Sequence, residues 1–233
     1  MAGSLKDRKF SLLLIAGIIF LSGPALAHAI SAANAQFVET IDGPAIIVFM
    51  YLGAKHMFTG ADHLLFLLGV IFFLHRLRDV VLYVSIFTLG HSATLLLGVL
   101  GNFGVNSQII DAIIGISVIY KAFDNLNGFR ILFGFQPNIK IAIFVFGLFH
   151  GLGLATKLQE ILTSNNGLWT NLLSFNVGVE IGQIAALSLV IGLLTIWRKT
   201  DWFQRTSTIV NGAIMCAGSV SYTHLTLPTN REV

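Results

Sequence analysis

Long runs of apolar residues alternate with short polar segments along almost the whole chain. Each interior run approaches or exceeds the roughly 20 residues that a helix needs to cross the hydrocarbon core of a bilayer. The first run contains Gly60, a weak point at which we expect a kink or a break. The pattern predicts an all-α protein, a polytopic transmembrane helical bundle of about six spans, at residues 44–74, 80–100, 108–127, 140–158, 169–197 and 207–220.

The N-terminal segment has the pattern of a signal peptide. A basic stretch at residues 6–9 precedes an apolar stretch at residues 10–21, and an Ala-x-Ala sequence ends at Ala27. This order of charge, apolar core and small residues is typical of a cleaved leader. We expect residues 1–27 to be the signal peptide; an uncleaved signal anchor is the alternative.

The rest of the chain divides in two. Residues 28–220 form the predicted transmembrane helical domain, because no linker is long enough to separate two domains. From Ser221 the chain becomes abruptly polar, and its last residues read SYTHLTLPTNREV. This tail, residues 221–233, resembles a translated sequencing adapter, and we interpret it as non-native.

The loops between the predicted spans indicate an orientation. If the mature N-terminus lies outside, six spans place residues 75–79, 128–140 and 197–206 inside, and basic residues concentrate there, as cytoplasmic loops of membrane proteins require. We therefore expect a protein of the bacterial inner membrane with its mature N-terminus outside. The basic residues of these three loops are Arg76, Arg78, Arg130, Lys140, Arg198, Lys199 and Arg205.

The composition supports a membrane protein and excludes other classes. Apolar residues make up 55% of the chain, charged residues only 11%, and the mean hydropathy is +0.81. A soluble domain carries roughly a quarter charged residues, so we expect the lipid bilayer as the main partner and no nucleic acid. Cys216 is the single cysteine, which excludes an internal disulfide and argues against a thiolate metal site.

Four of the predicted spans carry ionisable residues, which are costly inside a membrane and tend to be functional there. With a rise of about 1.5 Å per residue, His63, His91, His150 and Glu180 all fall near the middle of the bilayer. His56 falls nearer the outer face, as expected for a residue of a vestibule. Taken singly, such a histidine is more often a hydrogen-bonding group between helices, but four groups at one depth favour a common site.

Neighbouring residues place these groups on polar faces of their helices. Asn176, Glu180 and Gln183 are spaced as one helical face, and Thr88 lies one turn before His91. GxxxG patterns beside His150 and Glu180 predict that the helices approach closely there.

Imidazole and carboxylate ligands suit a borderline divalent cation such as nickel, cobalt or zinc better than magnesium or calcium. Asp62, next to His63, offers either a ligand or an acceptor that orients a histidine ring. We expect no tightly bound cofactor but a transported divalent cation, nickel first, with cobalt and zinc as alternatives. The predicted metal residues are His56, Asp62, His63, His91, His150 and Glu180, supported by Thr88, Asn176 and Gln183.

Four motifs between residues 53 and 183 resemble the HupE/UreJ family of hydrogenase and urease accessory membrane proteins. The resemblance is carried by His56-x3-Gly60-x-Asp62-His63-Leu64-Leu65-Phe66 and by the segments 87–95, 146–153 and 175–183. It implies permeation of nickel or a related metal, or an accessory role in metalloenzyme maturation. Asp111 departs from the family pattern, in which a glutamate is more usual at that place.

Three functions remain open at this point. The first is a permease for a divalent transition metal, with nickel as the expected ion and no catalytic residues. The second is a membrane-embedded metal-dependent hydrolase, which would need an open coordination position and a carboxylate base. The third is a scaffold whose polar groups only hold helices together. The chain has no P-loop, so transport would depend on gradients or on downhill flow.

Overall fold

The computed structural model describes residues 38, 41–103, 105–161 and 166–226, without the side chains at positions 61, 160–161 and 221–226. Over this part of the chain it has helices and no strand, which confirms the all-α class. The predicted signal peptide lies outside the described residues. The helices are α3 (Ile46–Thr59), α4 (Ala61–Ile71), α5 (Leu77–Gly101), α6 (Ser107–Asn125), α7 (Gly128–Phe133), α8 (Ile139–Ile161), α9 (Leu168–Arg198) and α10 (Asp201–Thr226).

The first predicted span is broken at Gly60. Its φ and ψ of −77° and 85° are not helical, so α3 ends at Thr59 and α4 begins at Ala61. The two pieces are 14 and 11 residues long, which makes each too short to cross a bilayer alone. The predicted weak point is therefore a true interruption, and it leaves a helix end inside the bundle.

Within the described part of the chain, three helices are long and apolar enough to cross a membrane, namely α5, α8 over Ile139–Gln159, and α9. Among the described residues, α6 is less apolar because Asp111, Lys121 and Asp124 interrupt it. Helix α10 begins at Asp201 and continues to Thr226, into the segment interpreted as a polar tail. The count of six spans stays a prediction.

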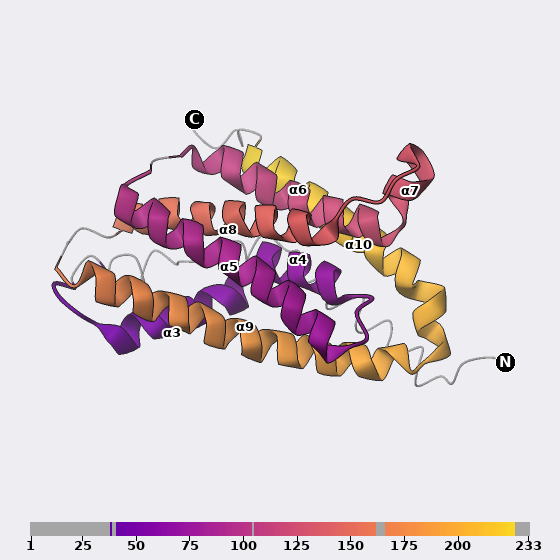
Figure 1. Ribbon diagram of the computed structural model, residues 1–233, viewed down its shortest axis with the longest axis horizontal. Helices are drawn as coiled ribbons and strands as arrows, with labels where there is room; N and C mark the ends of the chain where they lie inside the picture. Colours follow the sequence, from indigo (N-terminus) through magenta and orange to yellow (C-terminus); the bar gives the residue numbers. More distant parts are fainter. Residues whose placement is uncertain (1–37, 39–40, 104, 162–165, 227–233) are drawn as a thin grey trace, which may run out of the picture.

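The helices associate in three pairs, α3 with α9, α5 with α8, and α6 with α10 (Figure 1). Glycines let the first two pairs approach until their backbones touch. A Cβ on Gly178 would lie 2.0 Å from the Met50 carbonyl oxygen, and one on Gly151 would lie 2.0 Å from that of His91. The close approach predicted from the GxxxG patterns is confirmed.

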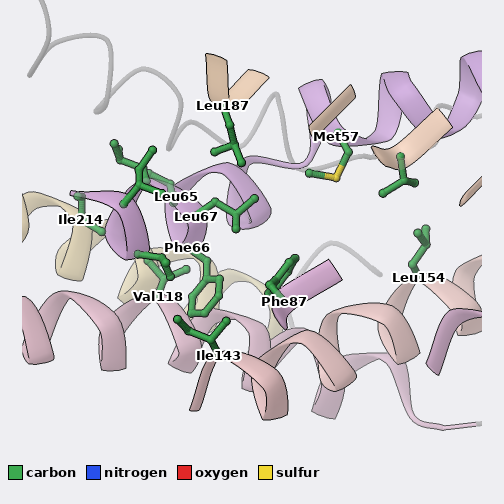
Figure 2. Packing of buried hydrophobic residues seen from close by; sticks show 14 of the residues in the cluster. Met57, Leu65, Phe66, Leu67, Phe87, Val118, Ile143, Leu154, Leu187 and Ile214 are labelled. Carbon is green, nitrogen blue, oxygen red and sulfur yellow. The ribbon is translucent and has the colours of Figure 1, made fainter. Parts of the chain in front are cut away.

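Helix α4 lies in the middle of these pairs and contacts α6, α9 and α10. Its residues from Leu65 to Ile71 are all buried. Figure 2 shows Leu65, Phe66 and Leu67 reaching from α4 into the hydrophobic cluster. The broken first span thus supplies the central helix of the core.

The C-terminal end of α4 is held by polar side chains from other helices. Arg198 donates hydrogen bonds of 2.6–2.8 Å to the carbonyl oxygens of Ile71, Phe72 and Leu74. Ile71 and Phe72 lie at the end of α4, where carbonyl groups have no intrahelical partner, and Leu74 follows in the loop. Arg198 was predicted to belong to a basic inner loop, and the structure gives it this capping contact as well.

A buried ion pair lies near the same end. The ammonium of Lys121 lies 2.7 Å from a carboxylate oxygen of Asp124 and 2.5 Å from the Asn125 amide oxygen. The Asn125 amide nitrogen in turn donates to the Gly69 carbonyl of α4 and to Asn211 of α10, each at 2.8 Å. This network joins α4, α6 and α10.

Candidate metal centre

Four histidine rings meet beside the N-terminal end of α4. The ring of His63 lies 4.9 Å from that of His56, 5.6 Å from that of His91 and 4.6 Å from that of His150, measured between ring centroids. All four side chains are buried, with at most 6% of their surface exposed. The structure therefore gathers imidazoles from α3, α4, α5 and α8 around one residue, His63.

The break at Gly60 explains why His56 belongs to this cluster. Counted along one straight helix, His56 and His63 are seven residues, or about 10 Å, apart in depth. Because α3 ends and α4 restarts, the two rings instead touch edge to face. The structure thus places His56 in direct contact with His63, and its predicted position nearer the outer face stays a prediction.

Most of the ring nitrogens have no hydrogen-bond partner among the described residues. These atoms are both nitrogens of His56 and His91 and the Nε2 atoms of His63 and His150. A buried polar atom without a partner costs roughly 1–3 kcal/mol. Such a concentration in one place points to a ligand that the nitrogens bind.

His150 is oriented for such a role. Its Nδ1 lies 2.8 Å from the Phe146 carbonyl oxygen, which can only accept a hydrogen bond. Nδ1 of the neutral ring therefore carries the proton, and Nε2 is left with a free lone pair. A fixed tautomer of this kind is typical of metal-binding histidines.

The donor atoms are close enough to share one ion. One nitrogen each from His56, His63 and His91 lie within 4.8 Å of one another. Around a four-coordinate ion with bonds of about 2.1 Å, such nitrogens would be about 3.4 Å apart. Small side-chain rotations would close that gap, so the three nitrogens could bind one ion.

A small cavity of about 40 Å³ adjoins the cluster and is lined by His56, His63, His150 and Asp62. Its lining also includes Asp111 and Lys157, whose side chains form an ion pair of 2.9 Å. Asp62 thus lines the same cavity as three of the four histidines.

Glu180 and the predicted supporting residues lie elsewhere. Glu180 is exposed and lines a separate hollow between α5 and α9 together with Thr88 and Gln183. Asn176 of α9 accepts a hydrogen bond of 3.0 Å from Ser92 of α5. The structure therefore brings four of the six predicted metal residues into one cluster, with Asp62 on the adjoining cavity, and places Glu180 apart.

One element of the site was not predicted from the sequence. Asp111 lies near the start of α6 but does not cap the helix, because the cap is Asn106, whose side chain accepts from the backbone of Gln108 and Ile109. Asp111 instead pairs with Lys157. Their separation of 46 residues along the chain gave no local signal for this contact.

The fold and the cluster define a class, an all-helical integral membrane protein with histidines from four helices meeting inside the bundle. The family model described as HupE / UreJ protein matches residues 32–227, and the chain belongs to this family. The family is associated with nickel and cobalt uptake for the maturation of hydrogenase and urease. No curated protein matches the chain, and no solved structure does.

Proposed function

We propose that this protein is a permease for a divalent transition metal, with nickel as the first expected ion, and that it supports metalloenzyme maturation. The proposal rests on one observation, the cluster of His56, His63, His91 and His150 with its unpartnered ring nitrogens. The metal is the cargo, so no resident cofactor is expected. The protein would act in the bacterial inner membrane with its mature N-terminus outside.

The state of the histidines argues against a scaffold. A histidine that only holds helices together would donate or accept a hydrogen bond across a helix interface. Of the four rings, His150 alone makes a hydrogen bond among the described residues, and its acceptor Phe146 is on its own helix α8. The cluster thus leaves buried nitrogens free at a cost that a structural role does not explain.

A membrane-embedded metal-dependent hydrolase is the second candidate. Three histidine ligands with an adjoining cavity are a donor set that also suits a catalytic zinc ion and its water. An enzyme would retain its ion through purification, whereas a permease would release it. Metal analysis of the purified protein separates these two functions, and one tightly held zinc ion per chain would favour the hydrolase.

The deciding experiment is uptake of radiolabelled nickel into cells and into proteoliposomes, with cobalt, zinc and manganese as competitors. Replacing His63 with Gln removes the ring that touches the other three. We expect His63→Gln to lower uptake roughly 10–100-fold, the range that loss of a metal-site group typically gives.

His75 supplies the matched control because it is exposed and lies in the turn between α4 and α5. His75→Gln should take up nickel as the unmodified protein does, at equal abundance in the membrane. Equal uptake by His63→Gln and His75→Gln would reject the cluster as the metal site.

A further inference from the structure

Glu180 lies at a position in α9 where a charged carboxylate is energetically unfavourable. It lies twelve residues into α9, about 18 Å from the start of a helix that is long enough to cross the membrane. It is exposed on that helix, and no described residue forms an ion pair or a hydrogen bond with it. An ionised side chain at this depth is expensive unless an opposite charge accompanies it.

The surroundings of Glu180 are polar on one side. Helix α5 packs mainly on α8 and α9 mainly on α3, so α5 and α9 are in contact at few places. Between them lies a hollow of about 390 Å³. Its polar lining comes from Ser85, Thr88 and Ser92 of α5 and from Glu180 and Gln183 of α9.

The hydrogen bonds around the hollow leave acceptor atoms available. The Thr88 hydroxyl donates to the Gln183 amide oxygen at 3.0 Å, and the Ser92 hydroxyl donates to Asn176 at 3.0 Å. With their protons engaged, both hydroxyl oxygens still have lone pairs. Together with the Glu180 carboxylate they form a set of oxygen acceptors on two facing helices.

Gln183 gives a second, independent sign of a ligand. Its side chain is only 3% exposed, yet its amide nitrogen has no partner among the described residues. If the amide is rotated by half a turn, its nitrogen donates a hydrogen bond to the Thr88 hydroxyl oxygen, and its oxygen takes the place of the unpartnered nitrogen. One of the two polar atoms of the Gln183 amide thus has a hydrogen-bond partner, and the other has none among the described residues.

We propose that this hollow binds an alkali cation the size of Na⁺, with Glu180 as the charged ligand and Thr88, Ser92 and Gln183 as neutral oxygen ligands. Oxygen ligands suit hard cations, whereas the imidazoles of the histidine cluster suit borderline metals. A single carboxylate neutralises a monovalent ion, but a divalent ion would leave a net positive charge in an apolar setting. The hollow is therefore a site for a different ion from the one that the histidines bind.

Helix α5 connects the two sites, since His91 faces the histidine cluster and Ser92 lines the hollow. If the metal permease proposal holds, the alkali ion is its coupling ion, and this role alone rests on the proposed function. Binding of the ion does not depend on it.

The test is binding of radiolabelled Na⁺ to the purified full-length protein in a choline buffer. We expect saturable binding that unlabelled Na⁺ displaces. Glu180→Gln keeps the shape of the side chain and removes its charge, so affinity should fall roughly tenfold or more. Thr88→Val removes one oxygen and should weaken binding, whereas Thr88→Ser retains the oxygen and should bind normally. Ile184→Leu, an apolar change in the same hollow, is the matched control.

The absence of saturable binding to the unmodified protein would overturn the proposal, and so would equal binding by Glu180→Gln. If Glu180→Gln does not fold, the two Thr88 variants decide, and equal affinity of Thr88→Val and Thr88→Ser would count against the site. Nickel binding by His63→Gln is measured in parallel. Loss of nickel binding with retained Na⁺ binding shows that the hollow binds its ion independently of the histidine cluster.

Discussion

Most ring nitrogens of the buried histidine cluster have no hydrogen-bond partner among the described residues. The rings contact one another and the apolar ring of Phe87, which supplies no acceptor for their nitrogens. Neutral imidazoles bring no negative charge, so a divalent cation bound by them would need nearby carboxylates to balance its charge. Among the described residues on the adjoining cavity, Asp62 and Asp111 are the acidic ones.

Asp62 is expected to act through its charge. Asp62→Asn keeps the size of the side chain but removes the charge that favours a dehydrated divalent cation inside the membrane. Nickel uptake should then fall roughly 10–100-fold, while the amount of protein in the membrane stays nearly normal. Asp62→Glu should retain part of the uptake, because the charge survives with an altered reach. Uptake and membrane abundance are measured together for both variants.

A structural Asp62 would give the opposite pattern. An amide can still bridge helices, so Asp62→Asn would transport normally, while the longer Glu would disturb packing beside His63 and lower the abundance. Normal uptake by Asp62→Asn removes this residue from the proposed metal path.

At the scale of the element, the backbones of α5 and α8 touch next to the histidines. Gly151 follows His150 directly, and its α-carbon faces the carbonyl oxygen of His91. The position of both rings therefore depends on the distance between these two helices. Gly151 has an ordinary helical φ, so its backbone conformation does not require glycine. The close approach of the two helices does, because it leaves no room for a Cβ.

Gly151→Ala should disturb both the stability and the site. The new Cβ would lie 2.0 Å from the His91 oxygen, a backbone atom that cannot move aside without separating the helices. Overpacking of this kind costs about 1–3 kcal/mol. We expect a lower unfolding temperature of the purified protein and reduced nickel uptake.

Gly192 of α9 is the control for this change because a Cβ added there would meet no side chain or neighbouring helix within 4 Å. Gly192→Ala should be neutral or slightly stabilising, since alanine favours a helix by roughly 1 kcal/mol relative to glycine. Equal unfolding temperatures for the two alanine variants would contradict the close packing of α5 on α8.

Periodicity and composition predicted the elements well where local sequence decides them. The apolar runs gave the cores of α5, α8 and α9, and the glycine at position 60 marked the break. They could not predict that the break moves His56 against His63, because that contact depends on the angle between α3 and α4. Periodicity also could not show that Glu180 of α9 lines a hollow between α9 and α5. The pattern identifies the face of α9 that carries Glu180 but not the helix that packs against that face.

At the scale of the whole molecule, the helix pairs have consistent directions. In the α5–α8 pair, Gly147 lies against Phe87 and Ala155 against Gly98, so these two helices run parallel. In the α3–α9 pair, Gly178 lies against Met50 and Gly182 against Ala54, which is again a parallel arrangement. The six predicted spans would give these directions, because alternate spans cross a membrane in the same direction.

The orientation of the helical bundle in the membrane can be tested at the loops on either end of the parallel helices α5 and α8. Asn102 follows the C-terminal end of α5 and Asn138 precedes α8, and because the two helices are parallel these exposed residues lie at opposite ends of the bundle. Single cysteines at each position, in a chain with Cys216→Ser, should therefore react with an impermeant thiol reagent from opposite sides. We expect Asn102→Cys to react from outside and Asn138→Cys only after the membrane is opened, because the basic loops belong inside. Labelling of both from one side would reject the six-span topology, and labelling with the sides exchanged would reject the outward N-terminus alone.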